Sequence, residues 1–281
     1  MRDAAGIVLA GGRSSRMGSP KAALEWHGST LLRRVTGIVA RVVDGPVIVV
    51  RAPGQQLPDL AVDVEIVDDA TEGRGPLQGL AGGLRAIGDR ASVAYLSSTD
   101  VPLLHPAFVA RVVAALGDDE DVVLPEIGGH RQPLAAAYRT SLLGIVKELI
   151  AADRLKPAFI FDRCRVLRLG EAALLDDSVL ARLDPALRSV QNLNEQADYR
   201  QARALPAPEV VVERFGTLAP KSGPRRETIR ACTLGAAALA VGLTLDEHVV
   251  AALNGDQISR DPHLPLAAGD SLAFLAADAG G

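Results

Sequence analysis

The sequence is poor in cysteine and has no hydrophobic run long enough to cross a membrane. Its 281 residues include two cysteines, Cys164 and Cys232, which lie far apart and form no Cys-x-x-Cys pair. This pattern argues against structural disulfides and against a zinc site. The most apolar stretch, residues 231–245, is interrupted by threonines and glycines and is shorter than the roughly 20 apolar residues of a transmembrane helix. Residues 1–5 do not begin a charged and then apolar leader, so we expect a cytoplasmic protein without a membrane partner.

A strong excess of positive charge is also absent. The formal net charge is -4, whereas proteins that bind nucleic acid carry a basic surface. We therefore expect no nucleic-acid partner. Hydrophobic residues make up 48% of the chain, which is enough for a sizeable core in one large domain or two smaller ones.

The first two hundred residues alternate between strand-like and helix-like patterns. Short apolar runs predict strands at residues 47–50, 64–67, 93–96, 122–124 and 134–138. Apolar residues at helical spacing predict helices at residues 31–43, 80–87 and 108–116. This alternation is typical of a Rossmann-like α/β domain with a mostly parallel sheet, which we place at residues 1–205.

The residues after this domain follow a different pattern. Pro206 and Pro208 mark a linker at residues 206–208, because two prolines in three residues favour an extended connector. Residues 209–281 then read as two strands, a short helix and two further strands. This order predicts a small β-grasp, or ubiquitin-like, domain whose size lies near the lower limit for folding alone.

A loop rich in glycine and serine follows a short apolar run at residues 6–9, which predicts a buried strand. Residues 9–21 read Leu-Ala-Gly-Gly-Arg-Ser-Ser-Arg-Met-Gly-Ser-Pro-Lys. Glycines permit tight turns, successive backbone N–H groups bind phosphate oxygens, and Arg16 and Lys21 add positive charge. The spacing fits neither the P-loop nor the dinucleotide fingerprint Gly-x-Gly-x-x-Gly. The loop predicts a nucleotide site at the carboxyl end of a parallel sheet, and the structural alternative is an ordinary glycine-rich connection.

The same loop resembles the signature of the molybdenum cofactor guanylyltransferases, a family of nucleotidyltransferases, which reads Leu-Ala-Gly-Gly-x-Ser-x-Arg-Met-Gly-x-x-Lys. The resemblance implies transfer of GMP from GTP to molybdopterin (the molybdenum cofactor) with release of pyrophosphate. It also implies that Arg16 and Lys21 are catalytic and neutralise charge on the departing pyrophosphate. The nucleotide would be bound by Leu9, Ala10, Gly11, Gly12, Ser14 and Lys21.

An aspartate followed by a proline comes shortly after the predicted strand at residues 93–96. Asp100 precedes Val101 and Pro102, and an acidic residue just past a strand end, beside a phosphate loop, is well placed to hold Mg²⁺. The family carries Asp-x-Pro at this point and uses the aspartate as its metal ligand. The resemblance therefore implies that Asp100 is a catalytic, nucleotide-binding and metal-binding residue, with Mg²⁺ as cofactor. The structural alternative is a turn or N-cap aspartate before Pro102.

Further acidic and amide residues match family positions near the two substrates. The resemblance implies that Asp69 contacts the guanine base, because a carboxylate accepts hydrogen bonds from both N1–H and the exocyclic amine. Asn192 and Asn194, in an Asn-x-Asn pattern, would lie near the acceptor pterin. Alternatives remain open: Asp69 as a solvated loop acid, and Asn194 as a helix N-cap before Glu195. We expect His130 to be an exposed loop residue.

The chain departs from the family at Arg51, where an asparagine commonly contacts the nucleotide. This departure leaves CTP open as an alternative substrate, in which case the chain would be a molybdenum cofactor cytidylyltransferase. A third interpretation is a carrier or docking protein whose transferase domain is inactive, although Lys21 and Asp100 are both intact.

The C-terminal domain ends in Gly280 and Gly281. It resembles the sulfur carriers, namely the small subunit of molybdopterin synthase and the thiamine sulfur carrier, whose terminal carboxylate becomes a thiocarboxylate. A tail without side chains can enter a narrow active site. The resemblance implies an adenylating sulfur-transfer enzyme and the large subunit of molybdopterin synthase as partners, and the structural alternative is a frayed terminus.

Overall fold

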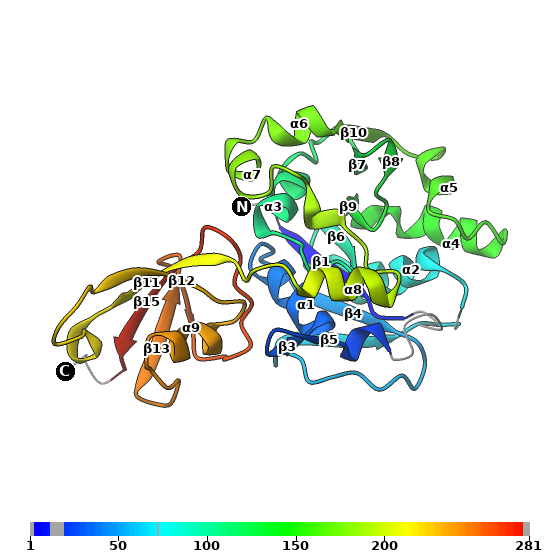
Figure 1. Cartoon of the computed structure of the whole chain (residues 1–281). Helices are drawn as coiled ribbons and strands as arrows, with labels where there is room; N and C mark the ends of the chain where they lie inside the picture. The colour runs from blue at the N-terminus through cyan, green and yellow to red at the C-terminus, as the bar shows by residue number, and fades with distance from the viewer. Residues whose placement is uncertain (1–2, 12–19, 72, 278–281) are drawn as a thin grey trace. The chain divides into compact units, whose positions relative to one another are not determined.

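The computed structural model describes residues 3–11, 20–71 and 73–277 (Figure 1). The chain divides into two compact units, Met1–Leu24 with Thr30–Gln196, and Glu25–Ser29 with Ala197–Gly281. Among the described residues, no helix combines the length and the apolar character that crossing a bilayer requires.

The first unit is a mixed α/β structure built on a parallel-rich sheet. Its strands are β1 (Ala4–Leu9), β4 (Val47–Arg51), β5 (Val64–Asp68), β6 (Val93–Ser98), β7 (Val122–Ile127), β8 (His130–Arg131), β9 (Ala135–Arg139) and β10 (Val166–Gly170). Its helices are α1 (Leu31–Ala40), α2 (Pro76–Ile87), α3 (Pro106–Ala114), α4 (Leu143–Ala151), α5 (Ala158–Phe161), α6 (Glu171–Leu175) and α7 (Ser178–Leu183). The predicted strands are confirmed as β4, β5, β6, β7 and β9, and the predicted helices as α1, α2 and α3.

The sheet has the order β10-β7-β9-β6-β1-β4-β5, with β8 paired to β7. Strands β6, β1, β4 and β5 are mutually parallel, so their carboxyl ends meet at one edge of the sheet. Strand β9, however, runs antiparallel to both β6 and β7. The reason is the short connection from β7, because a parallel return requires a crossover of about a dozen residues or more.

Neighbouring residues of β1 pack against helices on opposite faces of the sheet. A Cβ added to Gly6 would lie 2.4 Å from Val39 of α1, whereas one added to Gly83 of α2 would lie 2.6 Å from Ile7. A Cβ added to Gly79 of α2 would lie 2.8 Å from the Leu9 side chain. Successive strand side chains point to opposite faces, so the two helices clamp β1 from both sides. The end of β1 is thereby fixed where the glycine-rich loop begins.

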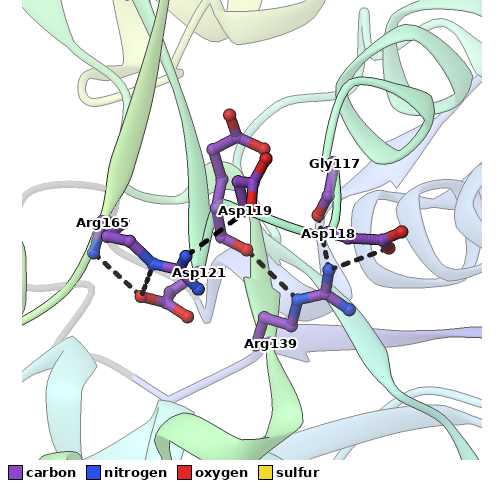
Figure 2. A network of polar contacts seen from close by, with 7 residues as sticks. Gly117, Asp118, Asp119, Asp121, Arg139 and Arg165 are labelled. Atoms are coloured by element: carbon purple, nitrogen blue, oxygen red, sulfur yellow. Dashed lines mark hydrogen bonds and ion pairs between the residues drawn. The ribbon is translucent and has the colours of Figure 1, made fainter.

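The amino end of β7, away from the strand ends that carry the predicted site residues, is closed by a network of arginines and acids (Figure 2). Arg139 donates from Nε to the carbonyl of Glu120 at 3.1 Å and also contacts the carbonyl of Gly117. The backbone N–H of Arg165 donates to Asp121 at 2.9 Å. This bond, helped by the Arg165 guanidinium, holds the pKa of Asp121 below its ordinary value. The network therefore ties the end of β9 and the start of β10 to the residues that precede β7.

The second unit contains a separate five-stranded sheet. Its elements are α8 (Gln196–Arg203), which begins at the boundary, β11 (Glu209–Arg214), β12 (Arg226–Arg230), α9 (Leu234–Ala240), β13 (Val249–Leu253), β14 (Gln257–Ser259) and β15 (Ser271–Ala276). The order is β12-β11-β15-β13-β14. Central strands β11 and β15 are parallel, and the other neighbours are antiparallel. Its own core includes Val212, Leu234 and Phe274.

Residues near the predicted linker belong to the second unit. Tyr199 of α8 donates its hydroxyl hydrogen bond to the carbonyl of Glu25, and Arg203 forms an ion pair with the Glu25 carboxylate. Residue Glu25 starts a short pair of strands, β2 (Glu25–Trp26) and β3 (Ser29–Thr30). These contacts explain why the compact units divide at Gln196. The domain boundary at residues 206–208 stays a prediction.

We predict that Gly83→Ala destabilises the protein by about 1–3 kcal/mol, because the added methyl group overpacks the buried Ile7. Gly82→Ala is the matched control. Its added Cβ would make an ordinary 3.5 Å contact with Val50, and alanine is the better helix former by about 1 kcal/mol. Urea unfolding measures both variants. Equal stabilities for Gly82→Ala and Gly83→Ala would contradict the close packing of α2 on β1.

Candidate functional site

Lys21 and Asp100 are brought together at the carboxyl edge of the parallel strands. Lys21 opens a short 3-10 helix, Lys21–Ala23, and Asp100 follows β6 after Thr99. The Lys21 Nζ lies 2.8 Å from Asp100 Oδ2, and the two side chains are 22% and 17% exposed. Ser98 donates its hydroxyl hydrogen bond to the other oxygen, Oδ1, at 2.6 Å. Both carboxylate oxygens are thus held at a partly open site, where a metal ion or a ligand can reach them.

The backbone around Asp100 is fixed by its neighbours. Thr99 donates from both its N–H (3.3 Å) and its hydroxyl (2.9 Å) to the carbonyl of Leu9, which ties the end of β6 to the end of β1. The carbonyl of Asp100 accepts from the N–H of Leu193 at 2.8 Å. The carboxylate therefore projects from a peptide that hydrogen bonds hold on both sides.

The start of the glycine-rich loop is tied to the end of β4. The Gln55 amide donates to the carbonyl of Ala10 and accepts from the N–H of Ala52, both at 3.0 Å. A Cβ on Gly11 would make an ordinary contact, 3.4 Å from the backbone nitrogen of Ala52, so the start of the loop lies against the residue that follows β4. The structure describes four of the loop residues predicted to bind nucleotide, namely Leu9, Ala10, Gly11 and Lys21. Gly12, Ser14 and Arg16 lie outside the described residues.

Asp69 places a carboxylate beside the first turns of α2. Its Oδ1 is buried and has no hydrogen-bond partner among the described residues. Burial raises the pKa of Asp69 above its ordinary value, and hydrogen bonds from Thr71, Ala70 and Gln78 offset part of the rise. A buried acceptor without a donor is costly for the protein alone. The geometry suits a ligand that brings its own N–H donor to this oxygen.

Arg51 and Asp69 meet through the backbone, where the Asp69 N–H donates to the Arg51 carbonyl at 2.7 Å, while the Arg51 side chain turns to other partners. Its Nε donates to Asp68 Oδ1 at 2.7 Å, and its Nη1 donates to the carbonyl of Gln55 at 3.1 Å. The Asp69 side chain contacts Gln78 of α2 instead. The guanidinium of Arg51 thus fixes the turn that carries Gln55, and this role was not predicted from the sequence.

Asn192 lies at a pocket near Asp100. The pocket has a volume of about 180 Å³ and is lined by Val101, Arg131, Gln132, Pro133, Leu134, Ala135, Val190 and Asn192. Asn192 and Asn194 are both exposed, and buried Leu193 separates them. His130 is exposed on β8 and does not line this pocket.

Asp100 could hold a divalent metal ion that takes few of its ligands from the protein. Among the described residues, no three histidine, cysteine, aspartate or glutamate side chains gather into a group that could hold a metal. Mg²⁺ commonly takes one or two carboxylates together with substrate phosphates and water. Asp100 supplies a hard, accessible oxygen pair of that kind, and Lys21 already places one cation against it.

Two residues of this region, Ser98 and Gln55, were missed by sequence reasoning. The signal for Ser98 was available, because a serine two residues before an acid at a strand end can reach that acid. Gln55 lies in a loop and bonds to a residue 45 positions earlier, and no spacing in the sequence indicates this contact.

Comparison with known proteins places most of the first unit in a family. Residues 6–166 match the MobA-like NTP transferase domain. A protein of Mycobacterium avium (strain 104), named probable molybdenum cofactor guanylyltransferase, is 38% identical over 208 residues, which cover 71% of this chain and 96% of that protein. A protein of the same name from Bacillus cytotoxicus is 27% identical over 168 residues, covering 59% of this chain and 83% of that protein.

A solved structure shares the fold. The crystal structure of molybdopterin-guanine dinucleotide biosynthesis protein A from Archaeoglobus fulgidus superposes with a TM-score of 0.55 at 21% sequence identity. The superposition covers 71% of this chain and 96% of that one. The family match ends before the C-terminal sheet begins.

We predict that Asp69→Asn stabilises the protein increasingly as the pH rises above the ordinary aspartate pKa of 3.8. The pKa of Asp69 is higher in the folded than in the unfolded protein. Ionising Asp69 therefore costs stability as the pH rises from the unfolded-state pKa to the folded-state pKa. Below that window both proteins are uncharged at this position and the difference is small. Urea unfolding at pH 3 and pH 7 measures the change, with the exposed Asp63→Asn as control. A difference independent of pH would contradict the burial of this charge.

Proposed function

The chain belongs to the MobA-like NTP transferase domain family, and on this premise we propose that it transfers GMP from GTP to molybdopterin. The observation that carries the proposal is the pairing of Lys21 with Asp100 at the end of the family's loop. Relatives named probable molybdenum cofactor guanylyltransferase, 38% identical to this chain, support the same reaction.

The proposed reaction needs charge stabilisation and alignment more than covalent catalysis. A phosphate oxygen of the acceptor attacks the α-phosphorus of GTP, a new P–O–P bond forms, and the bond to the leaving pyrophosphate breaks. The nucleophile is already anionic, so no general base is required. Orientation of the two substrates and stabilisation of developing charge account for the rate.

Asp100 would hold the magnesium ion, which supplies charge neutralisation at the phosphate oxygens when bound. Lys21 occupies one oxygen of that carboxylate at 2.8 Å. As GTP binds, Lys21 is expected to turn from Asp100 to the β- and γ-phosphates, where an ammonium group acts as a point charge. Arg16 is proposed as the second cation for the departing pyrophosphate.

Asp69 supports guanine as the base. Its buried Oδ1 lacks a donor, and guanine brings two adjacent donors, N1–H and the exocyclic amine, to a carboxylate. CTP is the alternative substrate. The engagement of Arg51 by Asp68 and Gln55 weakens the case for Arg51 as the residue that switches the base.

The pocket beside Asp100 is proposed to receive the acceptor. It combines apolar walls with the polar side chains of Arg131, Gln132 and Asn192, a mixture that suits a flat heterocycle with polar edges. Asn192 lines the pocket, and Asn194 is proposed to act from the same segment.

We expect GMP transfer to molybdopterin with Mg²⁺ from GTP, and at least about 100-fold loss in Asp100→Ala, because the metal loses its protein ligand. The assay runs GTP and CTP in parallel and uses the exposed Asp63→Ala as control. Product from CTP alone would overturn the guanylyl assignment. No product from either nucleotide, with the acceptor verified by an active enzyme, would favour a docking role for the first unit.

For the second unit we propose a β-grasp fold and the function of a sulfur carrier. Two parallel central strands, β11 and β15, flanked by antiparallel neighbours and followed by the Gly280–Gly281 tail, support this proposal. Gly280 and Gly281 lie outside the described residues. In this chemistry the Gly281 carboxylate attacks the α-phosphorus of ATP, pyrophosphate leaves, and hydrosulfide then displaces AMP to leave a thiocarboxylate.

Intact-mass spectrometry tests the carrier proposal. The full chain is incubated with ATP, an adenylating enzyme and a sulfur donor, and we expect exchange of one oxygen for sulfur at Gly281. Gly281→Ala serves as the variant that should block modification. An unmodified chain, while a known carrier is modified in the same mixture, would rule the proposal out.

A further inference from the structure

A buried carboxylate, Asp184, bonds to residues 188 and 189, which directly precede the pocket residue Val190. Asp184 is 7% exposed and Ser189 is fully buried. The Asp184 carboxylate accepts from the N–H of Arg188 at 2.7 Å, and from the N–H and the hydroxyl of Ser189 at 2.9 and 2.6 Å. Burying a charge is costly, and these three donors compensate for the cost. The charge therefore fixes the orientation of the Ser189 hydroxyl.

The Ser189 hydroxyl connects two segments of the site. Its oxygen accepts from the backbone N–H of His105 at 3.0 Å. At the other end of the same segment, the N–H of Leu193 donates to the carbonyl of Asp100 at 2.8 Å. Residues 189–193 are thus bonded at both ends to residues 100–105. Between these two bonds, Val101 on one side and Val190 and Asn192 on the other line the pocket.

Capping of the following helix does not explain the Ser189 bond. His105 is the N-cap of α3, and its own Nδ1 accepts from the N–H of Ala107 at 3.1 Å. The helix start is satisfied by His105 itself. What Ser189 adds is a bond across to the loop that carries Asp100. Arg34 of α1 holds the same loop from another side, through a 2.5 Å hydrogen bond to the carbonyl of Pro102.

We infer that Ser189, oriented by the buried Asp184, is a positioning residue that sets the spacing between the metal-binding loop and the acceptor segment. The inference rests on the proposed transfer to molybdopterin. The two bonded segments behave as one wall of the acceptor pocket, so Asn192 keeps a fixed distance from Asp100. Loss of the Ser189 hydroxyl widens that wall while it leaves Lys21, Asp69 and the Asp100 side chain with their own partners.

The test separates acceptor binding from nucleotide binding. In Ser189→Ala we expect KM for molybdopterin to rise about tenfold, since misplacement of a positioned group by about 1 Å can cost about 100-fold and the loss of one hydrogen bond moves the segment by less. The expected fall in kcat is less than about threefold. The Kd of GTP with Mg²⁺, measured without acceptor, should stay within about twofold of the wild-type value. Asp184→Asn should likewise raise KM for molybdopterin and leave the Kd of GTP unchanged. Its amide NH₂ group would face N–H or O–H groups that donate to the carboxylate in the wild type.

Thr140→Val is the matched control. Thr140 donates its hydroxyl hydrogen bond to the carbonyl of Ala91 at 2.9 Å, near the amino end of β6 and away from the pocket. Its removal costs a similar hydrogen bond but should not change KM for either substrate. An equal rise in the acceptor KM in Thr140→Val, or an equal weakening of GTP in Ser189→Ala, would overturn the inference.

Amide hydrogen exchange gives a second readout that needs no transferase activity. In Ser189→Ala and Asp184→Asn, faster exchange at both His105 and Leu193 would support a coupled wall. Faster exchange confined to residues 188–189 would overturn it. A wild-type chain that makes no product from GTP would count against the proposed function, and the exchange result would still decide the coupling.

Discussion

The ion pair between Lys21 and Asp100 is the contact on which the proposed chemistry depends. It joins the end of the glycine-rich loop to the end of β6, two segments 79 residues apart in sequence. The clamp of α1 and α2 on β1 and the hydrogen bonds from Thr99 to Leu9 place these two ends side by side. Both partners are partly exposed, so solvent screens the attraction and the pair contributes little to stability. A pair of this kind positions the Lys21 side chain, yet it can exchange one partner for a substrate.

Much of the first unit can be predicted from sequence, because its signals are local. Strands such as Val47–Arg51 are buried on both faces of the sheet and read as continuous β-branched runs. Thr30 caps α1 through its hydroxyl, and Pro106 begins α3, as residue preferences at helix starts indicate. The position of Asp100 just past a strand end was also predictable, because residues 93–96 read as a strand and β6 covers them. The direction of β9 was not predictable, because the apolar run at residues 134–138 carries no information about its partner strands.

The missed parts of the site depend on contacts between distant residues. Gln55 bridges Ala10 and Ala52, and Ser189 bridges Asp184 and His105. Glutamine and serine are common loop residues, so neither is distinctive until the fold brings its partners within reach. The division of the chain has the same origin, since α8 reaches back to Glu25 across more than 170 positions. Such pairings follow from packing, which local propensity does not encode.

The pairing of β11 with β15 in the second sheet has a mechanical consequence. In sequence β11 is the first strand of that sheet and β15 is the last, and in space they are parallel neighbours. A pull applied between the start of β11 and the end of β15 therefore loads all their shared hydrogen bonds in shear, and the bonds must break together. Antiparallel terminal strands would instead unzip one bond at a time under the same pull. The second unit should thus resist forced extension from its ends, a rate-controlled property distinct from its equilibrium stability.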